Sequence, residues 1–94
     1  MKQIAFKGGL VTSEDILRAL REFDQAYPDP NSYDRWLEKA NYKYAVSEGG
    51  KHYPPKHILS QATGVGIREF SGGYETNTIF RQLGFEIIDK PMGE

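Results

Sequence analysis

The chain has 94 residues, a formal net charge of −1 and no cysteine. Its length suits one hydrophobic core, and the absence of cysteine excludes disulfides, thiolate nucleophiles and cysteine-ligated metal sites. No apolar run approaches the roughly 20 residues of a membrane helix, and the first residues lack the apolar stretch of a secretory signal, so we expect a cytoplasmic protein without a membrane partner.

The first predicted helix covers about residues 13–26. Thr12 followed three residues later by Asp15 is typical of a capping box, and apolar residues then recur at helical spacing. Pro28 and Pro30 end this run because proline cannot continue a helix.

A second, short helix is expected after the cap residues Asn31 and Ser32. Tyr33, Trp36 and Leu37 would share one face of it. Trp36 is the only tryptophan, and it can either pack in the core against the first helix or form an exposed contact for a partner. The usual burial of large aromatic residues favours the core.

A hairpin is predicted next. Residues 42–46 alternate between aromatic or branched and other side chains, residues 48–50 read Glu-Gly-Gly and form a turn, and residues 51–53 return as a second strand.

The third helix should begin at Pro54-Pro55, where a missing backbone N–H costs nothing, and end at Gly64. A final helix from about Glu75 should end at Gly84 and lead into a strand over residues 85–88. These elements predict an α+β fold. Three or four short helices pack on a small antiparallel sheet built from the hairpin and the C-terminal strand. We expect one domain over residues 1–94, with its core at about 12–88 and short flexible ends.

The middle of the sequence is basic. Residues 39–68 contain five Lys or Arg and one Asp or Glu, whereas both flanking segments are acidic. Cations and aromatic side chains interleaved in this way suit phosphate neutralisation and base stacking. The alternative is that the tyrosines are core residues and the lysines solvate an exposed edge strand. The residues concerned are Lys43, Lys51, Lys56 and Arg68 for phosphate, with Tyr42, Tyr44 and Tyr53 for stacking.

The loop Phe70-Ser71-Gly72-Gly73 precedes the final helix and could hold an anion on free N–H groups. It matches neither a Walker loop nor a dinucleotide fingerprint. The more common role of such a loop is conformational, with glycine supplying positive φ and Phe70 anchoring it in the core.

His52 and His57 flank a double proline with no Asp or Glu between them. Two histidines without carboxylate or thiolate ligands are weak evidence for zinc, so we expect surface residues that add positive charge at low pH. The sequence contains no Asp/Glu-x-Lys tripeptide of a nuclease, and no serine or threonine has a base and an acid at a recognisable spacing. It therefore predicts no catalytic residue, no metal and no cofactor.

Three stretches together resemble a known family: Ile16–Asp24, Gly50–Leu59, and Phe70–Gly73 continuing to Leu83–Ile87. In this order they are similar to the N-terminal head domain of McrA-like, modification-dependent restriction endonucleases, from about residue 12 to residue 88. In that family the head resembles an accessory module ahead of the domains that read modified DNA and an HNH domain that cuts it. The sequence departs from related heads at residues 53–56, Tyr-Pro-Pro-Lys, where small or acidic residues often separate the tyrosine from the lysine.

The resemblance implies a non-catalytic accessory domain of a DNA restriction or defence system. One hypothesis is direct DNA binding through the basic hairpin region, with His52 and His57 and the loop at Ser71, Gly72 and Gly73 adding contacts. The other is a protein-docking or oligomerisation module, such as one carried by a phage or mobile element, that meets a nuclease or a second copy through Trp36 or the hairpin edge. The sequence leaves the oligomeric state open.

Overall fold

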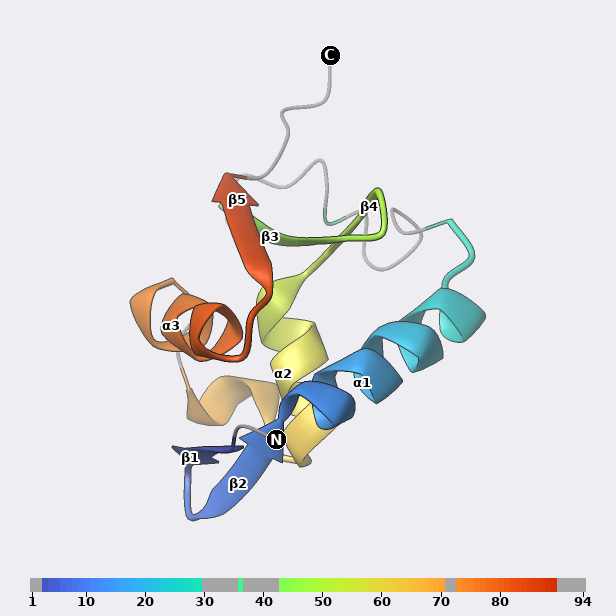
Figure 1. Ribbon diagram of the computed structural model, residues 1–94. Coiled ribbons are helices and arrows are strands. Elements are labelled where there is room, and N and C mark those ends of the chain that lie inside the picture. Colours follow the sequence, from blue (N-terminus) through green and yellow to red (C-terminus); the bar gives the residue numbers. More distant parts are fainter. Residues whose placement is uncertain (1–2, 30–35, 37–42, 71–72, 90–94) are drawn as a thin grey trace.

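Two short antiparallel sheets and three α-helices form the described part of the chain, which is residues 3–29, 36, 43–70 and 73–89 of a computed structural model (Figure 1). In chain order the elements are β1 (Gln3–Phe6), β2 (Gly9–Thr12), α1 (Ser13–Ala26), β3 (Tyr44–Glu48), β4 (Lys51–Tyr53), α2 (Pro55–Thr63), the 3-10 helix η3 (Ile67–Glu69), α3 (Tyr74–Gln82) and β5 (Glu86–Asp89). This arrangement confirms the predicted α+β class.

Helix α1 begins and ends where its sequence signals predict. The Asp15 backbone N–H donates to Thr12 Oγ1 at 3.2 Å, and the Thr12 N–H donates to Asp15 Oδ2 at 2.9 Å. This capping box satisfies two donors that a helix otherwise leaves unpaired. At the other end the Tyr27 N–H donates to the Phe23 carbonyl at 2.7 Å, just before Pro28.

An N-terminal hairpin precedes α1, and the sequence analysis did not predict it. Strands β1 and β2 pair antiparallel around Lys7 and Gly8, whose φ angles of 49° and 83° suit a two-residue hairpin turn. Phe6 and Val11 are buried, so the core begins before residue 12. Each strand has four residues, and only one in each is buried, which leaves too little periodic pattern to recognise.

The second sheet has the strand order β4-β3-β5, with both pairs antiparallel. Val46 on the central strand faces Tyr53 on one side and Ile87 on the other. Gly49 and Gly50 close the β3–β4 turn with φ angles of 60° and 80°, which glycine adopts at low cost. The predicted hairpin and the C-terminal strand are therefore both confirmed, while Tyr42 lies outside the described residues.

Helix α2 lies between α1 and α3, with the β1–β2 hairpin and the three-stranded sheet towards opposite ends of the molecule (Figure 1). It starts at Pro55 and stops where Gly64 turns left-handed at a φ of 79°. Helix η3 was not predicted, because three residues carry no periodic signal. No described helix is both long and apolar enough to cross a bilayer.

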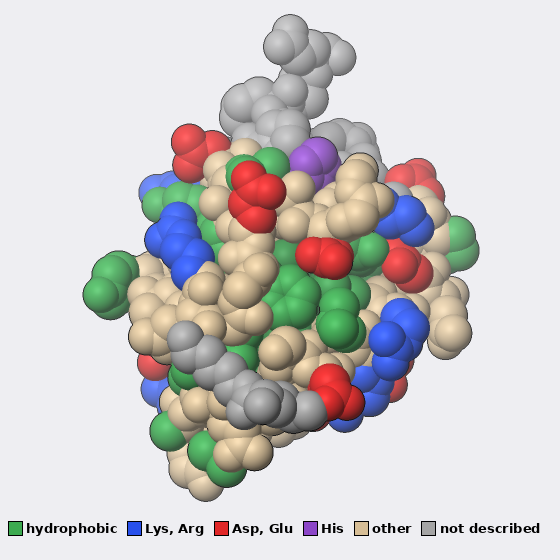
Figure 2. Space-filling model, viewed as in Figure 1, with side chains coloured by type: hydrophobic (Ala, Val, Ile, Leu, Met, Phe, Trp, Pro, Cys, Tyr) green, Lys and Arg blue, Asp and Glu red, His purple; other side chains and the backbone are tan. Residues whose placement is uncertain are grey.

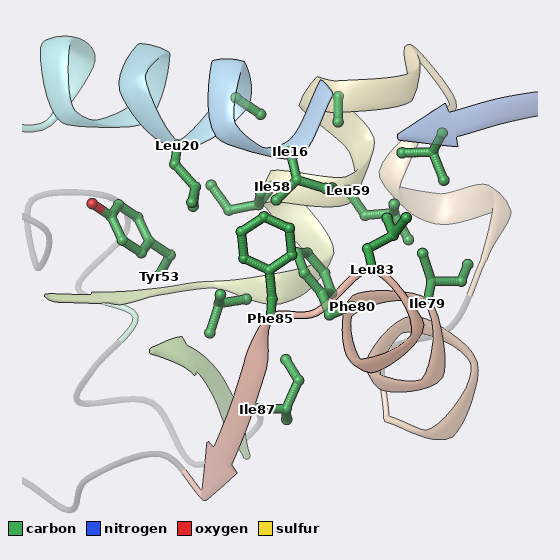
Figure 3. Close-up of a cluster of buried hydrophobic side chains, with 14 of the residues drawn as sticks. Ile16, Leu20, Tyr53, Ile58, Leu59, Ile79, Phe80, Leu83, Phe85 and Ile87 are labelled. Atoms are coloured by element: carbon green, nitrogen blue, oxygen red, sulfur yellow. The ribbon is translucent and has the colours of Figure 1, made fainter. Parts of the chain in front are cut away.

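The core collects one apolar face from each α-helix and from both sheets (Figure 3). Trp36 is fully buried, which excludes the exposed contact, although it is not part of this core cluster. The rest of the predicted second helix lies outside the described residues.

Candidate nucleic-acid interface

The structure divides the predicted site residues into two groups. Lys51, Tyr53 and His57 gather against the C-terminal half of α1. Lys56 contacts Phe70, and Arg68 lies two residues before Phe70 on η3. The two groups have different environments and are described in turn.

Tyr53 is a core residue that joins the sheet to α1. Its side chain is 3% exposed, and its hydroxyl lies 3.1 and 3.0 Å from the two carboxylate oxygens of Asp24. Its ring meets Phe23 edge-on at 5.6 Å. Burial, with the Asp24 carboxylate adding to it, raises the pKa of Tyr53 to about 12. A base cannot reach this ring, so the placement favours the structural interpretation of Tyr53.

Lys51 has a carboxylate partner. Its Nζ lies 3.5 Å from Asp24 Oδ1, and in the strand register it faces Glu48. A phosphate at Lys51 would compete with these carboxylates. His52 is half-buried on the same strand, opposite Ser47.

Lys43 immediately precedes β3, at the end where Tyr44 pairs with Asp89. Five strand steps of about 3.3 Å separate it from Glu48, the partner of Lys51, so the two lysines lie roughly 16 Å apart along the strand. The hairpin lysines therefore do not form one compact basic patch. Tyr44 is half-buried and packs against the core.

His57 packs against α1. Its ring centroid lies 5.6 Å from that of Phe23 and 6.3 Å from that of Tyr27. Burial lowers the pKa of His57 below its ordinary value of 6.5, so this side chain is neutral at pH 7. Over the described residues, no group of three or more His, Cys, Asp or Glu side chains could hold a metal ion.

The second group surrounds Phe70. Phe70 is buried, as its role of core anchor predicts, and Phe6 meets its ring edge-on at 5.1 Å. Lys56 Nζ lies over the Phe70 ring, 5.7 Å from its centroid, in a cation–π contact.

Two further cations lie close to Phe70 or Phe6 in the sequence. Arg68, two residues before Phe70, is exposed on η3, and η3 packs against α2. Next to Phe6, Lys7 Nζ lies 3.6 Å from Glu75 Oε2 at the start of α3.

Tyr74 is the aromatic residue that sequence reasoning missed. It is the first residue of α3 and is 85% exposed, so its ring projects into solvent. The helical spacing of the buried residues Thr76, Ile79 and Phe80 puts Tyr74 on the opposite face, and this signal could have identified it. We call Lys7, Lys56, Arg68 and Tyr74 the Phe70 face.

Gly73 precedes Tyr74 with a φ of 74°, which fits the conformational interpretation of the loop. Ser71 and Gly72, the other two residues of the predicted anion loop, lie outside the described residues.

Figure 2 shows Lys and Arg side chains interspersed with Asp and Glu over the face in view. Lys43 and Arg68 are both exposed, and neither forms an ion pair with another described residue. Two carboxylates near the Phe70 face already have partners, because Glu75 meets Lys7 and Glu69 Oε2 accepts from the Gly66 N–H at 3.2 Å. The uncompensated positive charge is therefore at a few separate positions.

These features define a small α+β domain whose distinctive groups, among the described residues, are its surface cations and the exposed ring of Tyr74. The sequence matches the family described as the ScoMcrA-like, N-terminal head domain over residues 9–89, and the chain belongs to this family. The match confirms the resemblance to the head of McrA-like restriction endonucleases. Neither the curated proteins nor the solved structures contain a match to the chain.

Proposed function

We propose that this domain is a non-catalytic accessory module of a DNA restriction system and that it contacts the DNA backbone through the Phe70 face. One observation carries the proposal: two cations lie close to Phe70, Lys56 over its ring and Arg68 two residues before it in the chain. Tyr74, four residues after Phe70, adds an exposed aromatic ring. Family membership supplies the DNA-acting context.

Backbone contact suits this arrangement better than base readout. Lysine and arginine neutralise phosphates without regard to sequence, whereas base readout needs side chains that reach into a groove. Lys56 is held over Phe70, and Arg68 has no described carboxylate partner to displace. A few cations on a surface of mixed charge give weak, sequence-independent binding, which fits a module that assists other domains.

The test is a fluorescence anisotropy titration with a short DNA duplex at two salt concentrations. We expect the affinity to fall by about 0.9 log units per log unit of salt for each phosphate neutralised. The Lys56→Ala, Arg68→Ala double variant should bind more weakly. Its affinity should also fall less steeply with salt, because two phosphate contacts are removed.

Lys43→Ala is the matched control, because Lys43 is also an exposed cation without a described carboxylate partner but lies next to β3, in the sheet at the other end of the molecule from the β1–β2 hairpin (Figure 1). It should bind like the wild type. Equal binding by the double variant and the wild type, or no binding of either duplex or single-stranded DNA at low salt, would overturn the proposal.

A second candidate function is docking onto a second copy through the sheet edges. Strands β4 and β5 are the outer strands of their sheet, and neither has a further strand partner among the described residues. Such edges offer unpaired N–H and C=O groups. Docking through Trp36 is ruled out by its burial. This candidate predicts a mass that rises with protein concentration, measured by analytical ultracentrifugation, and little dependence on salt.

A further inference from the structure

Tyr74 differs from the other described tyrosines. Tyr53 is buried, and Tyr27 and Tyr44 are half-buried against the core, whereas Tyr74 is 85% exposed. Within the described residues no hydrogen bond or ring contact engages its side chain. The fold therefore leaves both faces of one aromatic ring in contact with water, which is unfavourable for apolar surface unless a partner covers it.

The backbone under this ring is firmly held. Thr76 and Asn77 in the same helix are buried, and the Asn77 N–H donates to the Gly73 carbonyl at 2.8 Å. The ring thus stands on the first turn of a helix whose opposite face is anchored in the core. A ligand that covered the ring would not have to order the backbone first, and this lowers the entropic cost of binding.

Charged side chains of both signs lie near the start of α3, and the nearest cation, Lys7, already has a carboxylate partner. Glu75, the residue after Tyr74, contacts Lys7 at 3.6 Å. Lys7 follows Phe6, whose ring contacts Phe70, and Phe70 in turn lies under the ammonium group of Lys56. These contacts connect the α3 N-terminus to Lys7 and, through the buried rings of Phe6 and Phe70, to Lys56.

An exposed ring beside dispersed cations matches the chemistry of unpaired DNA. The cations can follow the phosphates, and the ring can stack on a base, whose π-face is accessible only when the base is not stacked inside a duplex. In duplex DNA the bases stack on each other, and the ring would find only backbone. Stacking on an aromatic side chain also tolerates any sequence, as expected for an auxiliary contact.

We infer that Tyr74 stacks on an unpaired base and that the domain therefore binds single-stranded DNA more tightly than duplex DNA of the same sequence. This inference rests on the proposed function, because it assigns the kind of DNA that the Phe70 face contacts.

The experiment compares a fluorescein-labelled 12-nucleotide single strand with the corresponding duplex by anisotropy at low salt, for the wild type, Tyr74→Ala and Tyr74→Phe. The wild type should prefer the single strand. Tyr74→Ala should lose roughly tenfold in affinity for the single strand and little for the duplex, while Tyr74→Phe, which keeps the ring, should bind like the wild type. Because Tyr74 is exposed, all three proteins should melt at similar temperatures, which circular dichroism would check.

Each other outcome has a distinct meaning. If the wild type binds both forms equally, or if Tyr74→Ala binds the single strand as well as the wild type does, the inference is wrong while the proposed function stands. If Tyr74→Phe loses as much affinity as Tyr74→Ala, the hydroxyl and not the ring makes the contact, and the inference is again wrong. If neither form binds at low salt, the proposed function fails, and the inference fails with it.

Discussion

At the residue scale, the Tyr53 hydroxyl links the β3–β4 hairpin to α1 through Asp24. Hydrogen bonds to a charged group contribute more than neutral ones, so Tyr53→Phe should lower the free energy of unfolding by about 1 to 2 kcal/mol. Urea denaturation measures the change. Tyr74→Phe is the control, because its hydroxyl is exposed and its removal should change stability by less than about 0.5 kcal/mol. An equal loss in both variants would contradict a specific role for the Asp24 contact.

The raised pKa of Tyr53, about 12, gives stability a defined pH dependence. An unfolded tyrosine loses its proton near pH 10, whereas the folded one keeps it to about pH 12. The stabilising effect of the protonated hydroxyl is therefore complete below pH 10 and is lost as the pH rises from 10 to 12. The stability difference between wild type and Tyr53→Phe should shrink over that window in urea denaturation, and a constant difference would argue against the raised pKa.

The half-buried His57 gives the opposite dependence, at the acidic end. Burial lowers its pKa below 6.5, so protonation is harder in the folded state than in the unfolded one. Stability is full above pH 6.5 and falls as the pH drops through the lowered folded value. His57→Phe keeps a ring against Phe23 and Tyr27 but cannot be protonated, so its stability should change less than that of the wild type between pH 7 and 5. Parallel pH profiles in thermal melts would contradict this prediction.

At the scale of the elements, helix α1 depends on its N-terminal cap. Thr12→Ala removes the oxygen that accepts the Asp15 N–H, and it should lower the free energy of unfolding by about 1 kcal/mol. Thr12→Ser keeps this oxygen and should preserve most of the stability. Chemical denaturation of the two variants checks the cap, and an equal loss in both would mean that the threonine methyl group matters more than the hydrogen bond.

At the scale of the whole molecule, the N-terminal hairpin completes the core. Phe6 inserts against Phe70, 82° from parallel, so Phe6→Ala should create a void and lower the free energy of unfolding by about 3 kcal/mol. Leu10→Ala, on the same hairpin but 61% exposed, is the matched control and should change little. Differential scanning calorimetry would compare the two. Similar melting temperatures for Phe6→Ala and the wild type would mean that the hairpin is not part of the cooperative unit.

The sequence predicted the elements whose signals are local. The cap at Thr12, the double glycine at residues 49 and 50, the proline start of α2 and the glycine at residue 84 each act within a few residues, and the structure has an element boundary or turn at each. The β1–β2 hairpin was not predicted because it is stabilised by the contact between Phe6 and Phe70, which are more than sixty residues apart in the sequence. Short strands of this kind have little intrinsic preference that a sequence pattern can reveal.

Fewer features of the candidate site than of the fold could be predicted from the sequence. Lys51, Tyr53 and Lys56 are close together in the sequence, so the sequence suggests that they form one site. In the structure Asp24 contacts Lys51 and Tyr53, whereas Lys56 lies over Phe70, and the sequence does not reveal this difference. Tyr53 is buried, whereas Tyr74 is exposed to solvent. Helical periodicity can indicate that Tyr74 is exposed, but whether Tyr53 is accessible depends on which distant segments cover it, and the local strand pattern does not contain that information.

By itself, then, the sequence determined the class of fold, the positions of the capped helices and the family, because capping, turn formation and helical periodicity are short-range properties of the chain. The tertiary structure alone decided which cations have carboxylate partners and that Tyr53 is buried against α1. The physical reason is that pairing and burial depend on contacts between segments far apart in sequence, and these contacts exist only once the core has formed.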